Sequence, residues 1–247
     1  MTNHVLLNNI SHHDLKVDTR YSEEFGDNVN LVLTFPTEFA DIQREYPIFF
    51  QKNQKTGQFQ SVALLGFEKG ENLFLGDGQW QASYVPGIIA RGPFLIGFQE
   101  QEVDGELQKE PVIHVDMDNP RVNKDQGRAV FLEHGGNTPY LEQIANILKG
   151  IHLGMAANQA MFAAFEALEL IEPVSVQVQL NEGKQYDLQG YYTISEEKLA
   201  NLDAESLFKL NRSGFLQGAY LVVASLSNVK KLIDMKNRKL MMAQTTA

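Results

Sequence analysis

The sequence predicts an α+β protein with strands in its first half and helices in its second. Apolar residues make up 43% of the 247 residues, and 15 Phe and 8 Tyr are spread along the chain, which is enough for a packed core. Short apolar runs separated by turn residues fill the first 135 or so residues, and helical spacing dominates after them. We therefore predict a strand-rich N-terminal part with antiparallel hairpins, and a helix-rich C-terminal part with one further hairpin.

Strand-forming residues are concentrated in short runs of the first half. Turns are predicted at Lys52–Gly57 and Gly76–Gly78, where glycine is combined with polar residues. The acidic segment Glu100–Glu110 is predicted to be an exposed loop. The runs predicted as strands are Asn30–Phe35, Pro47–Gln51, Ser61–Phe67, Pro93–Phe98 and Val112–Met117, and Asn72–Leu75 is an apolar piece before the second turn.

A long helix is predicted to open the second half. Thr138 can cap its N-terminus and Pro139 suits the first helical position. Apolar residues keep helical spacing as far as Leu170, and Gly150 and Gly154 predict a kink or a break on the way.

The remaining residues predict one hairpin followed by helices. Val174–Leu180 alternates apolar and polar residues and Tyr186–Ile194 is its return strand. Short helices are expected from Ser195 and over Asp203–Leu210, and a single last helix over Phe215–Met242. No repeat or free linker divides the chain, so we predict a single domain, 1–247, with subdomains 1–136 and 137–247 as the finer division.

Composition excludes several functional classes. The chain has 21 Lys and Arg against 31 Asp and Glu, a net charge of −10, and it has no basic patch to attract a phosphate backbone. It has no Cys, which excludes disulfides, thiolate metal sites and a Cys nucleophile. Because neither a signal peptide nor a run of about 20 apolar residues is present, we expect a cytoplasmic protein without membrane insertion or a nucleic-acid partner.

Four residues form the first candidate binding site. Trp80, Tyr84, Arg91 and Phe94 could line an aromatic groove with one cation, suited to a peptide or a flat ligand. The alternative is that the aromatic side chains pack in the core and that Arg91 pairs with a carboxylate.

A second candidate precedes the long helix. In His134-Gly135-Gly136, two glycines bare backbone N–H groups that could hold an anion at a helix N-terminus. The alternative is that the glycines supply a backbone conformation with positive φ before the Thr138 cap.

A metal site is the third candidate. His114 and Asp116 point to one face of a strand, and an HxD pair with a distant His, either His134 or His152, can hold Fe(II) as a facial triad. The alternative is that Asp116 caps the turn that follows it. Apart from this Fe(II), the sequence predicts no cofactor.

The chain resembles the SapC family of bacterial proteins over nearly its whole length. No single segment is specific, but their order and spacing together are. The segments that carry the resemblance are Tyr46–Phe50, Ala63–Phe67, Glu71–Phe74, Trp80–Pro86, Arg91–Phe94, Asp116–Arg121, His134–Gly136, Leu188–Tyr192, and Ser213–Leu216 continuing through Ser225–Leu226.

The resemblance implies a modest function. Members of this family lack an established catalytic activity, and the chain contains no nucleotide loop or nucleophile motif. We therefore predict a non-enzymatic binding or accessory protein with a protein or peptide partner. The alternatives are a metal-dependent oxygenase-like enzyme that uses His114 and Asp116, and a surface-layer-associated component suggested by the family name. The oligomeric state stays open.

Overall fold

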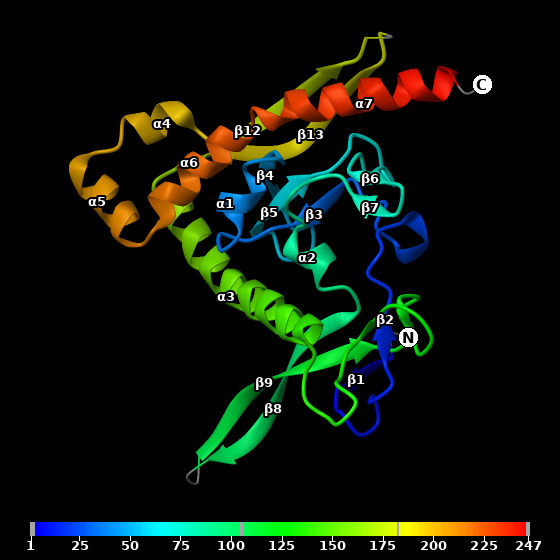
Figure 1. The fold of residues 1–247 in the computed structure, drawn as a ribbon. Coiled ribbons are helices and arrows are strands. Elements are labelled where there is room, and N and C mark those ends of the chain that lie inside the picture. Colours follow the sequence, from blue (N-terminus) through cyan, green and yellow to red (C-terminus); the bar gives the residue numbers. More distant parts are fainter. Residues whose placement is uncertain (1–2, 104–105, 182, 246–247) are drawn as a thin grey trace. The chain divides into compact units, whose positions relative to one another are not determined.

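The computed structural model describes residues 3–103, 106–181 and 183–245 and confirms the α+β class (Figure 1). The strands are β1 (His4–Leu6), β2 (Lys16–Val17), β3 (Leu31–Leu33), β4 (Ile48–Lys52), β5 (Phe59–Leu64), β6 (Leu75–Gly76), β7 (Gln79–Trp80), β8 (Phe94–Val103), β9 (Glu106–Asp116), β10 (Val122–Asn123), β11 (Arg128–Ala129), β12 (Ile171–Gln179) and β13 (Gln185–Ile194). The helices are α1 (Phe39–Ile42), α2 (Gly87–Ala90), α3 (Pro139–Ala167), α4 (Glu196–Ala200), α5 (Ala204–Arg212), α6 (Phe215–Ser225) and α7 (Asn228–Thr245).

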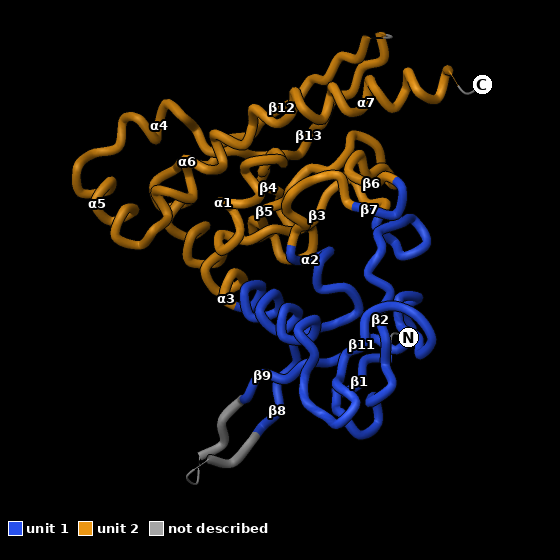
Figure 2. The backbone as a smooth tube through the Cα atoms, in the orientation of Figure 1, with its two compact units in different colours: residues 1–27, 77–79, 87–152 blue, residues 28–76, 80–86, 153–247 orange. Residues whose placement is uncertain are grey.

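The chain forms two compact units (Figure 2). Unit 1 comprises Met1–Asp27, Asp77–Gln79 and Gly87–His152, and unit 2 comprises Asn28–Gly76, Trp80–Pro86 and Leu153–Ala247. Both units draw on residues from either side of residue 136, and the single-domain organisation stays a prediction.

Unit 1 is built on an antiparallel sheet with the strand order β1-β9-β8. Phe94 lies opposite Val115, which in turn lies opposite Val5, so these three side chains share the inner face of the sheet. The first turns of α3 supply apolar residues to the same core. The buried members of this core are Leu15, Val17, Phe94, Val115, Val130, Phe131, Leu141, Ile144 and Leu148.

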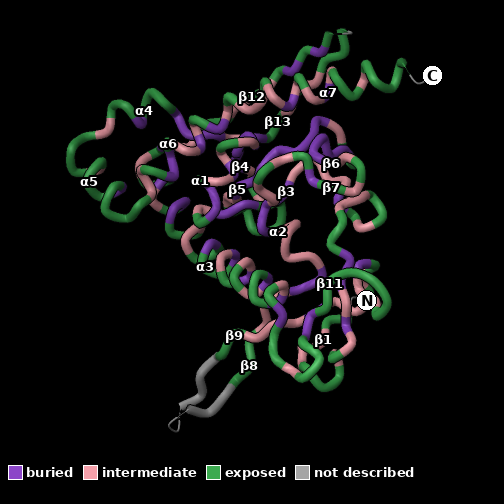
Figure 3. The backbone as a smooth tube through the Cα atoms, viewed as in Figure 1, coloured by how far each residue is buried: buried purple, intermediate pink, exposed green. Residues whose placement is uncertain are grey.

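Unit 2 is built on a five-stranded antiparallel sheet with the order β12-β13-β4-β5-β3. Burial is concentrated on β4 and β5 and is low on α4 and α5 (Figure 3). The ring of Phe50 on β4 meets Phe162 edge-to-face at 4.9 Å and lies 6.3 Å from Phe165, so α3 packs on this sheet through aromatic side chains.

Helix α3 is one unbroken helix, so a break at Gly150 or Gly154 is wrong; a kink there stays a prediction. Gly154 is needed for packing: a Cβ there would lie 2.5 Å from the Cβ of Phe35. The glycine allows close approach of the helix to Phe35, and the surrounding turns keep their helical hydrogen bonds.

Two further expectations need correction. The last helix is divided into α6 and α7, because Ser225 and Ser227 donate their hydroxyls to carbonyls of the preceding turn and compete with helix continuation. The acidic segment Glu100–Glu110 is part of the β8–β9 hairpin, in which Phe94 to Val103 pair with Val115 to Glu106. The prediction of a loop overlooked Asp104-Gly105, a dipeptide that is a hairpin signal in the sequence.

Candidate binding site

Unit 1 contains an open hollow of about 400 Å³. Its floor is apolar, with Leu7, Ile113, Phe131 and Leu141 among its lining residues. Its rim carries side-chain amides. We call it the amide-rimmed hollow, and its lining residues are Leu6, Leu7, Asn8, Asn9, Gln99, Val112, Ile113, Phe131, Gly136, Asn137 and Leu141.

The hollow forms where β1 leaves the sheet. Leu6 lies opposite His114, and the N–H of Leu7 donates to the carbonyl of Ile113 at 2.9 Å. The chain then turns, because the side-chain oxygen of Asn8 accepts from the backbone N–H groups of Ile10 and Ser11 at 3.2 and 2.8 Å. Strand β9 continues without β1 beside it, and this departure opens the hollow.

The turn before α3 closes one side of the hollow. Gly136 lines it, whereas the His134 side chain is exposed. The Gly135 N–H donates to the carbonyl of Leu132 at 3.0 Å, so this donor is used inside the turn. Both glycines have positive φ, 85° and 87°, as the alternative interpretation of this segment predicts. Anion binding by this segment stays a prediction.

Thr138 fixes the start of α3 beside the hollow. Its hydroxyl accepts from the N–H of Leu141 at 3.3 Å and donates to the carbonyl of Ala129 at 2.9 Å. The cap holds Leu141, which belongs both to the core and to the floor of the hollow.

The chemistry of the hollow is that of uncharged recognition. None of its lining residues carries a charge. In the described part of the chain, the side-chain amides of Asn9, Gln99 and Asn137 make no hydrogen bond, so each has donors and acceptors to offer a ligand. An apolar floor with a few polar groups around it is the usual composition of a binding pocket, and amides match the donor–acceptor pattern of a peptide backbone.

The proposed metal ligands lie next to the hollow without lining it. His114 and Asp116 are on one face of β9, and the imidazole of His4 lies 3.8 Å from the carboxylate of Asp116. The His114 ring covers Gly97, where a Cβ would lie 2.7 Å from it. Across residues 3–103, 106–181 and 183–245, no three His, Asp or Glu side chains are grouped to hold a metal ion.

The other two histidines proposed for that triad are exposed. His152 lies against the ring of Phe98, with centroids 5.2 Å apart, and His134 is in the turn before α3. Asp116 accepts from the backbone N–H of Asp118 at 3.2 Å, which is the capping role given as its alternative. The Fe(II) site stays a prediction.

The four residues of the proposed aromatic groove lie in different units. In unit 2, the indole N–H of Trp80 donates to the Tyr46 hydroxyl at 2.7 Å, and Tyr46 donates to the carbonyl of Tyr84. The Tyr84 hydroxyl donates to Glu38 at 2.7 Å. Burial and the negative charge of Glu38 raise the pKa of Tyr84 above its ordinary value.

Arg91 and Phe94 belong to unit 1. Phe94 is fully buried, and Arg91 donates to the Phe94 carbonyl at 2.6 Å. Burial lowers the pKa of Arg91. Since Phe94 is a core residue and the Trp80 indole is bound within unit 2, these side chains serve packing as the structure places them, and their role in binding stays a prediction.

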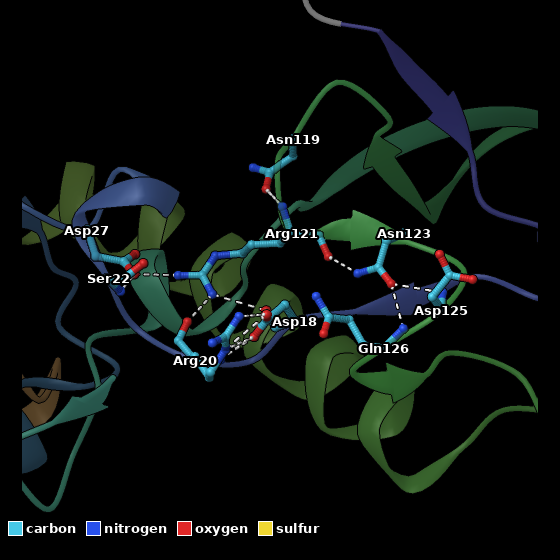
Figure 4. A network of polar contacts seen from close by, with 9 residues as sticks. All are labelled: Asp18, Arg20, Ser22, Asp27, Asn119, Arg121, Asn123, Asp125 and Gln126. Atoms are coloured by element: carbon cyan, nitrogen blue, oxygen red, sulfur yellow. Dashed lines mark hydrogen bonds and ion pairs between the residues drawn. The ribbon is translucent and has the colours of Figure 1, made fainter. Parts of the chain in front are cut away.

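Arg121, the last residue of the Asp116–Arg121 segment, organises a buried polar network in unit 1 (Figure 4). Its guanidinium pairs with Asp27 and donates to the carbonyls of Asp18 and Arg20. It also lies 4.5 Å from the centroid of the Phe25 ring. The sequence analysis did not single out this residue; an Arg that follows an Asn-Pro turn carries no signal for burial.

The comparisons with known proteins bear on the whole chain. A model of the SapC family matches residues 7–232. The chain belongs to the SapC family. The match confirms the resemblance carried by the segments between Tyr46 and Leu226. Neither the curated proteins nor the solved structures contain a match to this SapC protein.

The helices were also compared with the requirements of a membrane span. Among those formed by residues 3–103, 106–181 and 183–245, none is both long and apolar enough to cross a bilayer.

Proposed function

We propose that this SapC-family protein is a non-enzymatic binding or accessory protein of the cytoplasm, and that it recognises a protein or peptide partner at the amide-rimmed hollow. The observation that carries the proposal is the lining of the hollow: an apolar floor, three amides (Asn9, Gln99 and Asn137) that make no hydrogen bond within the described residues, and no charged side chain.

This lining favours binding over acid–base or nucleophilic chemistry. General acid–base and nucleophilic catalysis need a titratable or activated side chain at the reacting atoms. Amide side chains supply hydrogen bonds at constant charge, and the floor residues Leu7, Ile113 and Leu141 supply apolar area for one or two side chains of a partner. The metal-dependent and surface-layer alternatives stay predictions, and no observation at this site favours them.

The test is selection of binding peptides from a random peptide display library on the full-length protein. Selected peptides are then measured against variants that fill the hollow, Asn9→Trp and Gln99→Trp. Both positions are exposed and their side chains make no hydrogen bond in the described residues, so the substitutions leave the fold intact.

Gln126→Trp is the matched control, because Gln126 is an exposed amide of the same unit that does not line the hollow. We expect each filling variant to weaken the selected peptides by about tenfold or more and the control to leave them unchanged. A selection that yields no peptide, or peptides indifferent to both filling variants, contradicts the proposal.

A further inference from the structure

Strand β9 has a backbone edge with no partner strand. Strand β1 pairs only with residues from His114 to Asp116, and the last contact on that side is the Leu7–Ile113 hydrogen bond. Strand β8 occupies the opposite side of β9 along its whole length. Within the described residues, β9 from Glu106 to Val112 therefore has no strand on the β1 side, and the amide-rimmed hollow lies where that side opens.

The direction of the backbone groups follows from the strand geometry. The carbonyl of Ile113 points toward β1, since it accepts from Leu7. Backbone groups alternate in direction along a strand, so those of Pro111 and Lys109 point to the same open side. Pro111 offers only a carbonyl, and Lys109 offers both an N–H and a carbonyl. An unpaired row of this kind is a template for an added strand.

The acidic residues of the β8–β9 hairpin determine which charge an added strand should carry. The segment 99–110 contains one base, Lys109, and its acids are Glu100, Glu102, Asp104, Glu106 and Glu110. Glu100 and Glu110 are exposed; Glu110 lies opposite the uncharged Gln99, and Glu100 lies opposite Lys109. A cationic strand is attracted to this edge and an anionic strand is repelled from it.

The faces of β9 then fix the pattern of the occupant. Glu110 lies opposite Gln99 and shares its face, whereas Pro111 lies opposite the half-exposed Phe98 and shares the other face. A strand beside β9 presents alternate residues to these two faces. Basic residues suit the Glu110 face. On the other face, where Glu100 lies opposite Lys109, apolar residues suit the neighbouring Pro111 and Phe98.

We infer that the partner is an extended segment of alternating basic and apolar residues, which adds an antiparallel strand to the open edge of β9 beyond the end of β1. This inference rests on the proposed function and specifies its partner class. In an antiparallel pair, residues that exchange hydrogen bonds share a face, so the apolar residues of the segment direct their N–H groups to β9.

The probe is a capped, fluorescein-labelled octapeptide of alternating Lys and Val, and its binding to the full-length protein is measured by anisotropy. We expect N-methylation of the valines to weaken binding by about tenfold, because it removes the hydrogen bonds to β9, and N-methylation of the lysines to have little effect. The Glu-Val octapeptide is expected not to bind, and added salt is expected to weaken the Lys-Val octapeptide.

Two proline variants separate the two edges of the hairpin. Lys109 and Glu100 lie opposite each other, and their backbone groups point to the open edges of β9 and of β8. Lys109→Pro removes a donor from the β9 edge and is expected to weaken binding of the Lys-Val octapeptide about tenfold. The loss of the Lys109 charge, which repels the peptide's lysines, acts in the opposite direction. Glu100→Pro removes the corresponding donor from β8, and we expect at most a twofold effect from the lost charge.

Retained affinity of the N-methylvaline octapeptide overturns the inference even where Lys109→Pro fails to fold. If only Glu100→Pro lowers the affinity for the Lys-Val octapeptide, the peptide binds at the β8 edge and the inference is overturned. If library peptides depend on the hollow but the Lys-Val octapeptide does not bind or is insensitive to N-methylation, this inference fails while the proposed function stands. If no peptide of any kind binds, both fail.

Discussion

The polar network around Trp80 in unit 2 and the amide-rimmed hollow in unit 1 are opposites. In the first, the Trp80 indole donates to the Tyr46 hydroxyl, which donates to the Tyr84 carbonyl, and the Tyr84 hydroxyl donates to Glu38. In the second, the amides of Asn9, Gln99 and Asn137 line an open hollow and make no hydrogen bond within the described residues. The polar groups of the network are paired within the fold, whereas these three amides of the hollow are not paired within the described residues.

The comparison separates stability from recognition. A buried polar group contributes to the folded state only while its partner is present, and its loss leaves that partner unsatisfied. An exposed amide is hydrated in the free protein, so replacing it costs little stability. Substitutions in the network are therefore expected to change the free energy of unfolding, and substitutions at the hollow are expected to change affinity.

Trp80→Ala is expected to have the largest effect. The indole is 9% exposed and stacks on Phe74 with ring centroids 6.1 Å apart. Its removal leaves a cavity and takes away the donor to the Tyr46 hydroxyl, and we expect the free energy of unfolding to fall by about 3–5 kcal/mol in urea titrations. The affinity of the folded variant for selected peptides should equal that of the unsubstituted protein. A stable variant that has lost peptide binding would instead revive the aromatic groove as the binding site.

Unit 1 has its own closed network, and Arg121→Met is the test of it. Asp27 is 7% exposed in its pair with Arg121, so the substitution leaves a buried carboxylate without its cation, and we expect a loss of about 3 kcal/mol. The matched control is Lys124→Met, which breaks the exposed pair with Asp14 and should leave the free energy of unfolding nearly unchanged. Equal losses in urea titrations of the two variants would contradict the assignment of Arg121 as a buried anchor.

Much of the fold could be predicted from the sequence, because the spacing of apolar residues that distinguishes strands from helices can be read from one sequence. The Val174–Leu180 and Tyr186–Ile194 runs gave the β12–β13 hairpin, and Thr138-Pro139 gave the start of α3. The errors fell where side chains override local signals. Ser225 and Ser227 divide the last helix, and Gly154 is a packing position inside a continuous helix.

The candidate site was much harder to predict. Sequence reasoning favours residues with strong chemistry, such as Trp80, Arg91 and His114, and the structure uses these in packing or in pairs within the fold. Of the seven residues proposed for binding, Gly136 lines the hollow. Asn9, Gln99 and Asn137 are ordinary surface amides in the sequence. They come together through the pairing of β1, β8 and β9 and the turn before α3, which no local pattern encodes.

Tyr84→Phe tests the network with a smaller change. Glu38 loses the Tyr84 hydroxyl as a donor and keeps that of Thr34, so we expect a loss of about 1 kcal/mol at pH 7. Because the folded pKa of Tyr84 lies above the unfolded value of about 10, its contribution is full below pH 10 and is lost as pH rises beyond it. Urea titrations at pH 7 and pH 11 should therefore show a smaller alkaline loss in the variant; an equal alkaline loss would show that Tyr84 titrates normally.

Pro111→Ala is expected to have the smallest effect and tests the open side of the comparison. The substitution adds an N–H group to the open edge of β9, where Pro111 offers only a carbonyl, and a further hydrogen bond to an exposed strand strengthens binding by a few-fold. Anisotropy with the Lys-Val octapeptide measures the gain, and Pro120→Ala is the control, since Pro120 is exposed in the turn after β9. Unchanged affinity would place the peptide away from this edge. A gain that the N-methylvaline octapeptide does not share would show that Pro111 limits strand addition at this edge. A free sheet edge needs such a limit to avoid pairing with other chains.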